Sequence, residues 1–375
     1  MKRKSLFIII LALIVVATAG CSLSNISKNN KETIKIGALL PLTGGAAIYG
    51  DSAQKAAEIA VEEINAKGGI NGHKIEINYQ DHQCAPQAAI SAFQQLSNVN
   101  GLKLFSSVAC SGTVLGIAPL LKSDQILIAT VVSSVKVTGV SPSVFRNYAS
   151  DADGARLFGE YIVNNNLRKI AIIYEETDYA KGMKLMLEKN LENKEVKIVS
   201  EGFTTDATDV RTPLLKLKNA NPDVLLMSVQ SPTSGDKVLK EAKEINFRPK
   251  TLLVNEAIMH SADLNSKYKN YLDGAISTDF AIENIVSVKN LLDTYKEKYG
   301  ADCPQQNACI GMYDDIYILA EAAGKNNMDM SQAVESLKNI NYSGAGGEIS
   351  FDKNNDRKNA HFILYQIKNS EIIPY

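Results

Sequence analysis

The sequence contains no tryptophan and only four histidines. It also lacks the G-x-S-x-G, H-E-x-x-H and G-x-x-x-x-G-K-[ST] patterns, and no G-x-G-x-x-G opens the first predicted helix. A nucleophile, a catalytic metal and a phosphate-binding loop therefore have no recognisable source, and the sequence predicts a protein that is not an enzyme and needs no cofactor. The histidines are far apart, and each is interpreted as a surface or loop residue: His73, His82, His260 and His361.

The chain also lacks an excess of one charge sign. It has 40 Lys and Arg residues against 41 Asp and Glu residues, and removal of the first 20 residues would take away three basic ones, leaving a side-chain charge of 37 − 41 = −4. Because nucleic-acid binding relies on clustered basic side chains, the sequence predicts no nucleic-acid partner. After residue 33 no apolar run is long enough for a membrane span.

The first 21 residues have the order of a secretion signal. Basic residues at 2–4 precede an apolar run, 6–16, and small residues at 18–20 precede Cys21. This order resembles a bacterial lipoprotein signal, which implies cleavage after residue 20 and a diacylated Cys21. Such a protein is extracytoplasmic and lipid-anchored to the cell membrane, on its periplasmic side or outer face. An ordinary secretory signal followed by an incidental cysteine is the alternative.

Four cysteines remain once Cys21 is set aside, and four thiols allow three pairings. An oxidising compartment permits disulfides. We favour Cys84 with Cys110, which would join the loops after two neighbouring strands, and Cys303 with Cys309, which would close a short loop.

Two short motifs imitate metal sites. Residues 81–84 place one histidine and one cysteine two positions apart, which is at best half of a metal site. Asp352, Asn354 and Asp356 imitate the start of a calcium loop but lack its glycine and its distant glutamate, so a polar hairpin turn is the better interpretation. No metal is therefore expected.

Strand-like and helix-like stretches alternate twice along the chain, which predicts an α/β fold of two doubly wound parallel-sheet lobes. The expected strands of the first series are 34–40, 73–79, 102–108 and 125–131, with helices at 50–67, 86–97 and 113–122. The expected strands of the second are 169–174, 196–201, 224–228 and 251–254, with helices at 152–165, 182–193, 210–220 and 236–245.

The remaining segments are too short for a third domain and are expected to complete the first two. Helices are expected at 285–299, 311–325 and 332–338, followed by two strands around 352–356. Crossings near 145–148, 275–280 and 342–348 would form a three-strand hinge on which the lobes could close. The predicted divisions are a signal peptide at 1–20, a lipidated tether at 21–32, lobe 1 at 33–147 plus 279–345, and lobe 2 at 148–278 plus 346–375.

Several short motifs closely resemble the leucine/isoleucine/valine-binding protein family, the type I periplasmic binding proteins of amino-acid ABC transporters. They are PLTG at 41–44, YG at 49–50, AVEEINAKGGING at 60–72, YQD at 79–81, TDYAKG at 177–182, NE at 255–256 and GEISFD at 347–352. The resemblance covers essentially the whole chain after the signal. The family also includes binders of amides, ureas and aromatic acids.

The resemblance implies a site for the carboxylate of a free amino acid. Ser111 lies where a strand ends and a helix begins, so its N–H and hydroxyl suit a carboxylate, together with Thr113. Ser133 matches a second hydroxyl position, although a one-residue length difference leaves Ser134 as an alternative. Val131 is expected to offer a backbone carbonyl to the ammonium group.

The resemblance also implies partners for the ammonium group and the side chain. Glu256, after the strand 251–254, matches the acidic residue that binds the ammonium. Tyr179 matches a cleft tyrosine of the second lobe, and Tyr49 an aromatic residue that covers the ligand from the first. A further family tyrosine is replaced by Gln230 or Ser231, which makes the side-chain pocket less aromatic.

These expectations describe a monomeric, extracytoplasmic solute-binding lipoprotein. It would capture a branched-chain or otherwise aliphatic amino acid and deliver it, chemically unchanged, to ABC transporter permease subunits. Two alternatives stay open: a ligand-sensing receptor component of the same fold, and a binder of an amide or urea.

Overall fold

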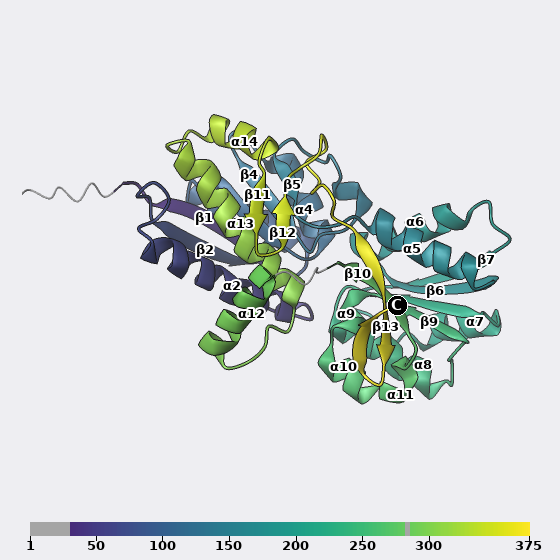
Figure 1. The fold of residues 1–375 in the computed structure, drawn as a ribbon. Helices are drawn as coiled ribbons and strands as arrows, with labels where there is room; N and C mark the ends of the chain where they lie inside the picture. Colours follow the sequence, from purple (N-terminus) through teal and green to yellow (C-terminus); the bar gives the residue numbers. More distant parts are fainter. Residues whose placement is uncertain (1–30, 282–285) are drawn as a thin grey trace, which may run out of the picture. The chain divides into compact units, whose positions relative to one another are not determined.

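The two βα series form two separate sheets in the computed structural model (Figure 1). The structure describes residues 31–281 and 286–375, so the predicted signal and Cys21 lie outside the described residues. From Thr33 to Tyr375 the chain forms one unit. None of the helices in the described ranges is long and apolar enough to cross a membrane. The predicted α/β fold with two parallel sheets is confirmed.

The first sheet has five parallel strands in the order β2-β1-β3-β4-β5. These are β1 (Ile34–Leu40), β2 (Ile75–Asp81), β3 (Leu104–Val108), β4 (Ile126–Thr130) and β5 (Val144–Arg146). Its helices are α2 (Ala47–Ala66), α3 (Pro86–Gln94), α4 (Ser111–Ile117), α12 (Val286–Tyr299), α13 (Gln306–Lys325) and α14 (Met330–Lys338).

Strand β1 shows why this sheet is covered on both faces. Ile36 and Leu40 pack into the core under α2, α13 and α14, whereas Leu39 packs into the core under α3 and α4. Successive strand residues point to opposite faces, so a strand that is apolar throughout needs helices on both sides. This explains the near-continuous apolar run of the strand.

The second sheet has seven strands in the order β14-β13-β10-β9-β8-β6-β7. Its parallel part is β6 (Lys169–Glu175), β7 (Lys197–Phe203), β8 (Val224–Ser228), β9 (Thr251–Val254) and β10 (Ile276–Phe280). The C-terminal hairpin, β13 (Phe362–Lys368) and β14 (Glu371–Pro374), adds to it antiparallel.

The helices of the second sheet divide between its faces. The core on one face includes side chains of α5 (Asp151–Asn164) and α6 (Asp178–Leu191). The core on the other includes α7 (Arg211–Asn219), α8 (Pro232–Glu244) and three short helices. The short helices were not expected from the sequence: α9 (Glu256–Met259), α10 (Ala262–Lys267) and α11 (Lys269–Leu272).

The chain passes between the two sheets three times. The first passage leads from β5 to α5, and the second from β10 to α12, whose Val288 and Leu291 pack against α2. The third comes after the hairpin of β11 (Tyr342–Gly344) and β12 (Gly347–Ile349), because Ile349 and Phe351 lie in the core of the first sheet. We therefore place the last lobe boundary between residues 357 and 362, later than the predicted residue 346.

The calcium-like motif forms a hairpin turn, as its composition indicates. The Asp352 carboxylate accepts the N–H groups of Asn354 at 2.8 Å and Asp356 at 2.9 Å, and Phe351 pairs antiparallel with Arg357. Residues 350–361 form isolated bridges and turns but no strand, so the expected pair of strands directly around 352–356 is wrong. The strands that complete the second sheet are β13 and β14, further along the chain.

The cysteines pair as the sequence analysis favours, Cys84 with Cys110 and Cys303 with Cys309. His82, beside the first disulfide, is fully buried and accepts the Cys84 N–H on Nδ1 at 3.0 Å. Burial lowers its pKa to about 4, which keeps the ring neutral. His82 lies in the loop after β2 and His73 outside the named strands and helices, which agrees with a surface or loop position, but both are buried, His73 being 6% exposed.

Candidate functional site

A small pocket of about 270 Å³ lies where strands of both sheets end. Ligands of open α/β sheets bind beyond the carboxyl ends of the strands, where loops and helix starts meet. The pocket contains five of the seven residues that the sequence analysis assigns to ligand binding, together with three that it does not. The lining residues are Tyr49, Ala109, Cys110, Ser111, Val131, Tyr179, Gln230 and Glu256.

The wall from the first sheet has strained backbone. Ala109 and Cys110 both have φ of +63°, and Val131 has φ of +54°. A left-handed conformation is unfavourable for residues with a Cβ, above all for a β-branched valine, and persists only where surrounding contacts enforce it. Here the Ala109 N–H donates to Thr130 O at 3.0 Å, and Cys110 is held by its disulfide. Such strain clusters at functional sites, and none of these positions is a glycine that would have revealed it.

Ser111 begins α4 directly after the strained turn. Its Oγ accepts the backbone N–H of Ser134 at 3.2 Å, which joins the loops that follow β3 and β4. Thr113 lies behind the pocket and does not line it: it is fully buried, and its hydroxyl donates to Cys110 O at 2.8 Å. Thr113 therefore supports the turn that carries Ser111.

Ser133 also lies behind the pocket wall. Its carbonyl oxygen accepts the Asp151 N–H at 2.7 Å and an Arg146 guanidinium N–H at 3.3 Å. Arg146 also donates to Ser134 O at 3.1 Å. Of the two candidate serines, Ser133 and Ser134, it is Ser134 that bonds to Ser111. Neither of the two lines the pocket.

The wall from the second sheet carries an acidic cluster. The Tyr179 hydroxyl, near the start of α6, donates to Glu256 Oε2 at 2.6 Å. The Asn255 amide donates to Tyr179 Oη at 3.0 Å and to Val229 O at 2.6 Å, which fixes the tyrosine against the ends of β8 and β9. The supporting role of Asn255 was not found from the sequence, although it precedes Glu256 directly.

Burial raises the pKa of Glu256 to about 7; the negative charge of Asp279 adds to this, and the Tyr179 hydrogen bond opposes it. Burial and the charge of Glu256 raise the pKa of Asp151 to about 8. No lysine or arginine forms an ion pair with either carboxylate within residues 31–281 and 286–375. A cation entering the pocket would relieve this unbalanced negative charge.

Tyr49 covers the pocket from α2 and is only 4% exposed. Burial, together with the charge of Glu256, raises its pKa well above the ordinary tyrosine value. Burial, and then the charge of Glu256, raise the pKa of Tyr179 in the same way. Both phenols therefore stay protonated and can donate hydrogen bonds across the pocket.

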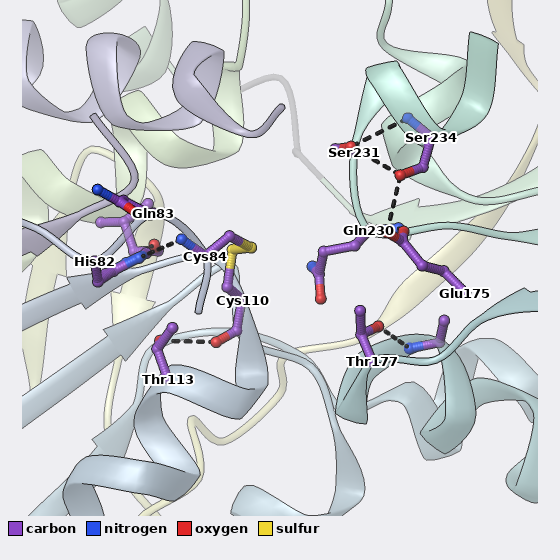
Figure 2. Close-up of a disulfide and its surroundings, with 12 residues drawn as sticks. His82, Gln83, Cys84, Cys110, Thr113, Glu175, Thr177, Gln230, Ser231 and Ser234 are labelled. Carbon is purple, nitrogen blue, oxygen red and sulfur yellow. Dashed lines mark hydrogen bonds between the residues drawn. A yellow bond between two sulfur atoms is a disulfide. The ribbon is translucent and has the colours of Figure 1, made fainter. Parts of the chain in front are cut away.

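Gln230 enters the pocket from the turn between β8 and α8. Figure 2 shows its side chain extending toward the gap opposite Cys110. The sequence analysis mentions this position only as a departure from the family pattern, since a turn after a strand does not by itself indicate where a side chain points. The same turn begins α8 with Ser231, whose Oγ accepts the Ser234 N–H at 3.2 Å.

Comparisons with known proteins bear on the family and the fold of the chain. Residues 33–371 match the family model of periplasmic binding proteins. A leucine-, isoleucine-, valine-, threonine- and alanine-binding protein of Pseudomonas aeruginosa is 25% identical over 341 residues, which cover 89% of this chain and 90% of that protein.

Two solved structures are also similar in fold. A branched-chain amino acid transporter substrate-binding protein of Streptococcus pneumoniae, in complex with isoleucine, has a TM-score of 0.77 at 23% identity and covers 91% of this chain and 97% of that one. The second is a solute-binding protein of an ABC transporter from Rhodopseudomonas palustris, in complex with 3,4-dihydroxybenzoic acid. It has a TM-score of 0.77 at 20% identity, and the match covers 91% of this chain and 95% of that one.

Proposed function

Because the chain belongs to the periplasmic binding protein family, whose members are extracytoplasmic solute-binding proteins and not enzymes, we propose that it captures a free amino acid and delivers it to the permease of an ABC transporter. One observation carries the proposal. Ser111 and Glu256, from different sheets, line the same small pocket, and among the described residues Glu256 forms no ion pair with a lysine or arginine, while the nearby His260 pairs with Asp279.

The two ends of an amino acid suit the two walls of the pocket. The carboxylate would exchange water for the Ser111 hydroxyl and the backbone N–H groups at the start of α4, which contacts of Thr113 and Ser134 support. The ammonium would bind the Glu256 carboxylate, with the Val131 carbonyl as a further acceptor. Tyr49 and Tyr179 would then cover the solute, and exclusion of water would strengthen each polar contact.

Two observations bear on the side chain of the solute. The sequence predicts a branched-chain or otherwise aliphatic side chain. The Pseudomonas aeruginosa relative is named for five small amino acids, one of which, threonine, carries a hydroxyl.

An aromatic acid is the second candidate, since the Rhodopseudomonas palustris structure contains 3,4-dihydroxybenzoic acid. Such a ligand is an anion without an ammonium group. It would have to bind near Glu256, Asp151 and Asp279, which unfavourably adds negative charge to a site with three buried carboxyl groups. An amide or urea ligand can donate hydrogen bonds to Glu256 but brings no positive charge to it.

A thermal-shift screen of the purified protein against free amino acids, amides and hydroxybenzoates tests the proposal. A dye must report unfolding, because the chain has no tryptophan. A specific ligand at 100 times its Kd adds about 2.7 kcal/mol of stability. A shift with an amide or a benzoate and with no amino acid would contradict the amino-acid assignment. Replacing Glu256 by Gln should abolish the shift for amino acids and spare a neutral amide.

The lipid anchor is a separate proposal, supported by the order of residues 2–21. Acylation at Cys21 would hold the protein near the permease, and two acyl chains give stable membrane attachment where one is marginal. Labelling of cells with radioactive palmitate tests it: the wild type should incorporate label, and Cys21→Ser should not. An unlabelled wild-type protein found free outside the cytoplasm would favour the ordinary secretory signal.

A ligand-sensing component of the same fold would bind a similar solute. The two roles differ in the partner, so uptake of the labelled amino acid separates them. Deletion of this protein should abolish high-affinity uptake if it serves a permease and should leave uptake unchanged if it serves only a sensor.

A further inference from the structure

Gln230 places a primary amide in the pocket. It lies two residues beyond the end of β8, and its partly buried side chain extends into the gap that faces Cys110 (Figure 2). An amide has two N–H donors and an oxygen that can accept two hydrogen bonds. The side chain of Gln230 makes no hydrogen bond to any residue that the structure describes.

The backbone of Gln230, by contrast, is held firmly. Its N–H donates to Glu175 Oε2 at 2.7 Å, and Oε1 of the same carboxylate accepts the Ser234 hydroxyl at 2.9 Å (Figure 2). Glu175 is only 3% exposed. The preceding carbonyl, Val229 O, accepts the Asn255 amide at 2.6 Å. The turn is therefore fixed from both sides, and only the amide is left without a partner.

The first lobe approaches this turn closely. A Cβ added at Gly45, in the loop before α2, would lie 3.0 Å from Ser231 Oγ and 3.2 Å from Thr233 Cβ. The Gln230 side chain thus extends into a narrow space that Ala109 and Val131 also line. An aliphatic solute in that space would leave the amide without water and without a partner, which is unfavourable.

We propose that Gln230 selects amino acids whose side chain carries a hydroxyl or a carboxamide over aliphatic amino acids of the same shape. The inference rests on the proposed function and replaces the predicted aliphatic side chain of the solute with a small polar one. Glu175 is the positioning residue that holds the Gln230 backbone. A site that hydrogen-bonds a polar group discriminates against the analogue that lacks it, because its own buried group is then left unpaired.

Isothermal titration with two pairs of amino acids of similar shape tests the inference: threonine against valine, and asparagine against leucine. At least one polar member should bind the wild type about tenfold more tightly than its aliphatic partner. Gln230→Met keeps the side-chain length and removes the amide, so it should bring that ratio close to one. The same substitution at Gln94, exposed on α3 and outside the pocket, should leave the ratio unchanged.

The outcomes separate the two proposals. If valine and leucine bind the wild type as tightly as their polar partners, or if Gln230→Met keeps the preference, the selective role of Gln230 is wrong and amino-acid capture stands. If no amino acid binds, capture itself is wrong and the inference falls with it. Should Gln230→Met not fold, Gln230→Glu replaces the amide donors at almost unchanged shape and is expected to change the same ratio.

Discussion

The hydroxyl of Tyr179 donates a hydrogen bond of 2.6 Å to Glu256 Oε2, and both side chains line the same pocket. Tyr179 comes from the start of α6 and Glu256 from the end of β9, 77 positions apart in the sequence. This bond stabilises the ionised form of a carboxylate that burial disfavours.

Replacing Tyr179 by Phe should weaken amino-acid binding about tenfold while the fold persists. The variant loses a hydrogen bond to a charged group, which contributes roughly 1.5–3 kcal/mol, and keeps the aromatic ring. Titration calorimetry measures the affinity, and circular dichroism checks the fold. Tyr375, 61% exposed at the C-terminus, provides the matched control, and Tyr375→Phe should bind as the wild type does. Equal affinity in both variants would contradict a role of the Tyr179 hydroxyl.

Amino-acid affinity should rise with pH up to about pH 7 and then level off. Glu256 has its pKa raised to about 7 in the free protein, so below that pH it is mostly protonated and must lose a proton to bind an ammonium. Affinity should therefore fall by up to tenfold per pH unit as the pH decreases below 7. Calorimetry from pH 5 to pH 8 measures this.

The titration of Glu256 also affects the stability of the free protein, which changes with pH in the direction opposite to that of the affinity. Because the folded-state pKa of Glu256 lies above its ordinary value, the free protein loses stability as the pH rises from about 4.5 to about 7. Glu256→Gln should remove this contribution and flatten the pH dependence of stability of the free protein, measured by urea unfolding from pH 4.5 to pH 7. A variant whose stability keeps the wild-type pH profile would show that another group titrates.

The disulfide at the pocket should matter for binding, and the second disulfide should not. Cys110 lines the pocket in a left-handed conformation that its bond to Cys84 helps to hold, so Cys84→Ser with Cys110→Ser should lower affinity severalfold. The matched control replaces Cys303 and Cys309, which are buried between α12 and α13. Each pair should lose about 2–4 kcal/mol of stability at most, measured by urea unfolding. Equal affinity of the two double variants would contradict a specific role of Cys84 and Cys110.

Replacing Arg146 by Met should destabilise the protein by about 3–5 kcal/mol. Arg146 is 1% exposed and donates to Asp356 Oδ2 at 2.5 Å and to Thr138 Oγ1 at 2.7 Å, so the variant leaves several groups near the third passage without a partner. Urea unfolding measures the loss. Arg156, half exposed in its ion pairs, is the control, and Arg156→Met should change stability by less than about 1 kcal/mol. Similar losses in the two variants would contradict the importance of the buried pair.

Much of the fold could be predicted because its signals are local. The apolar run of β8, 224–228, and that of β9, 251–254, have the predicted bounds, and most helices begin or end within a few residues of the expected positions. The C-terminal hairpin was missed because β13 and β14 alternate polar and apolar residues weakly, and the pairing of β13 with β10 joins segments far apart in the sequence. The short helices α9 to α11 give too few turns for a periodic pattern.

The sequence alone determined that two parallel sheets form and that polar residues follow their strands, since hydrophobic periodicity and strand ends are properties of neighbouring residues. Only the tertiary structure decided which of those residues meet. It brings Ser111 to Ser134, places Glu256 against Tyr179, turns Gln230 into the pocket and holds Val131 in a left-handed conformation. Each of these arrangements depends on contacts between segments far apart in the chain. Such contacts compensate for the cost of backbone strain and of buried polar groups, which a local sequence pattern does not indicate.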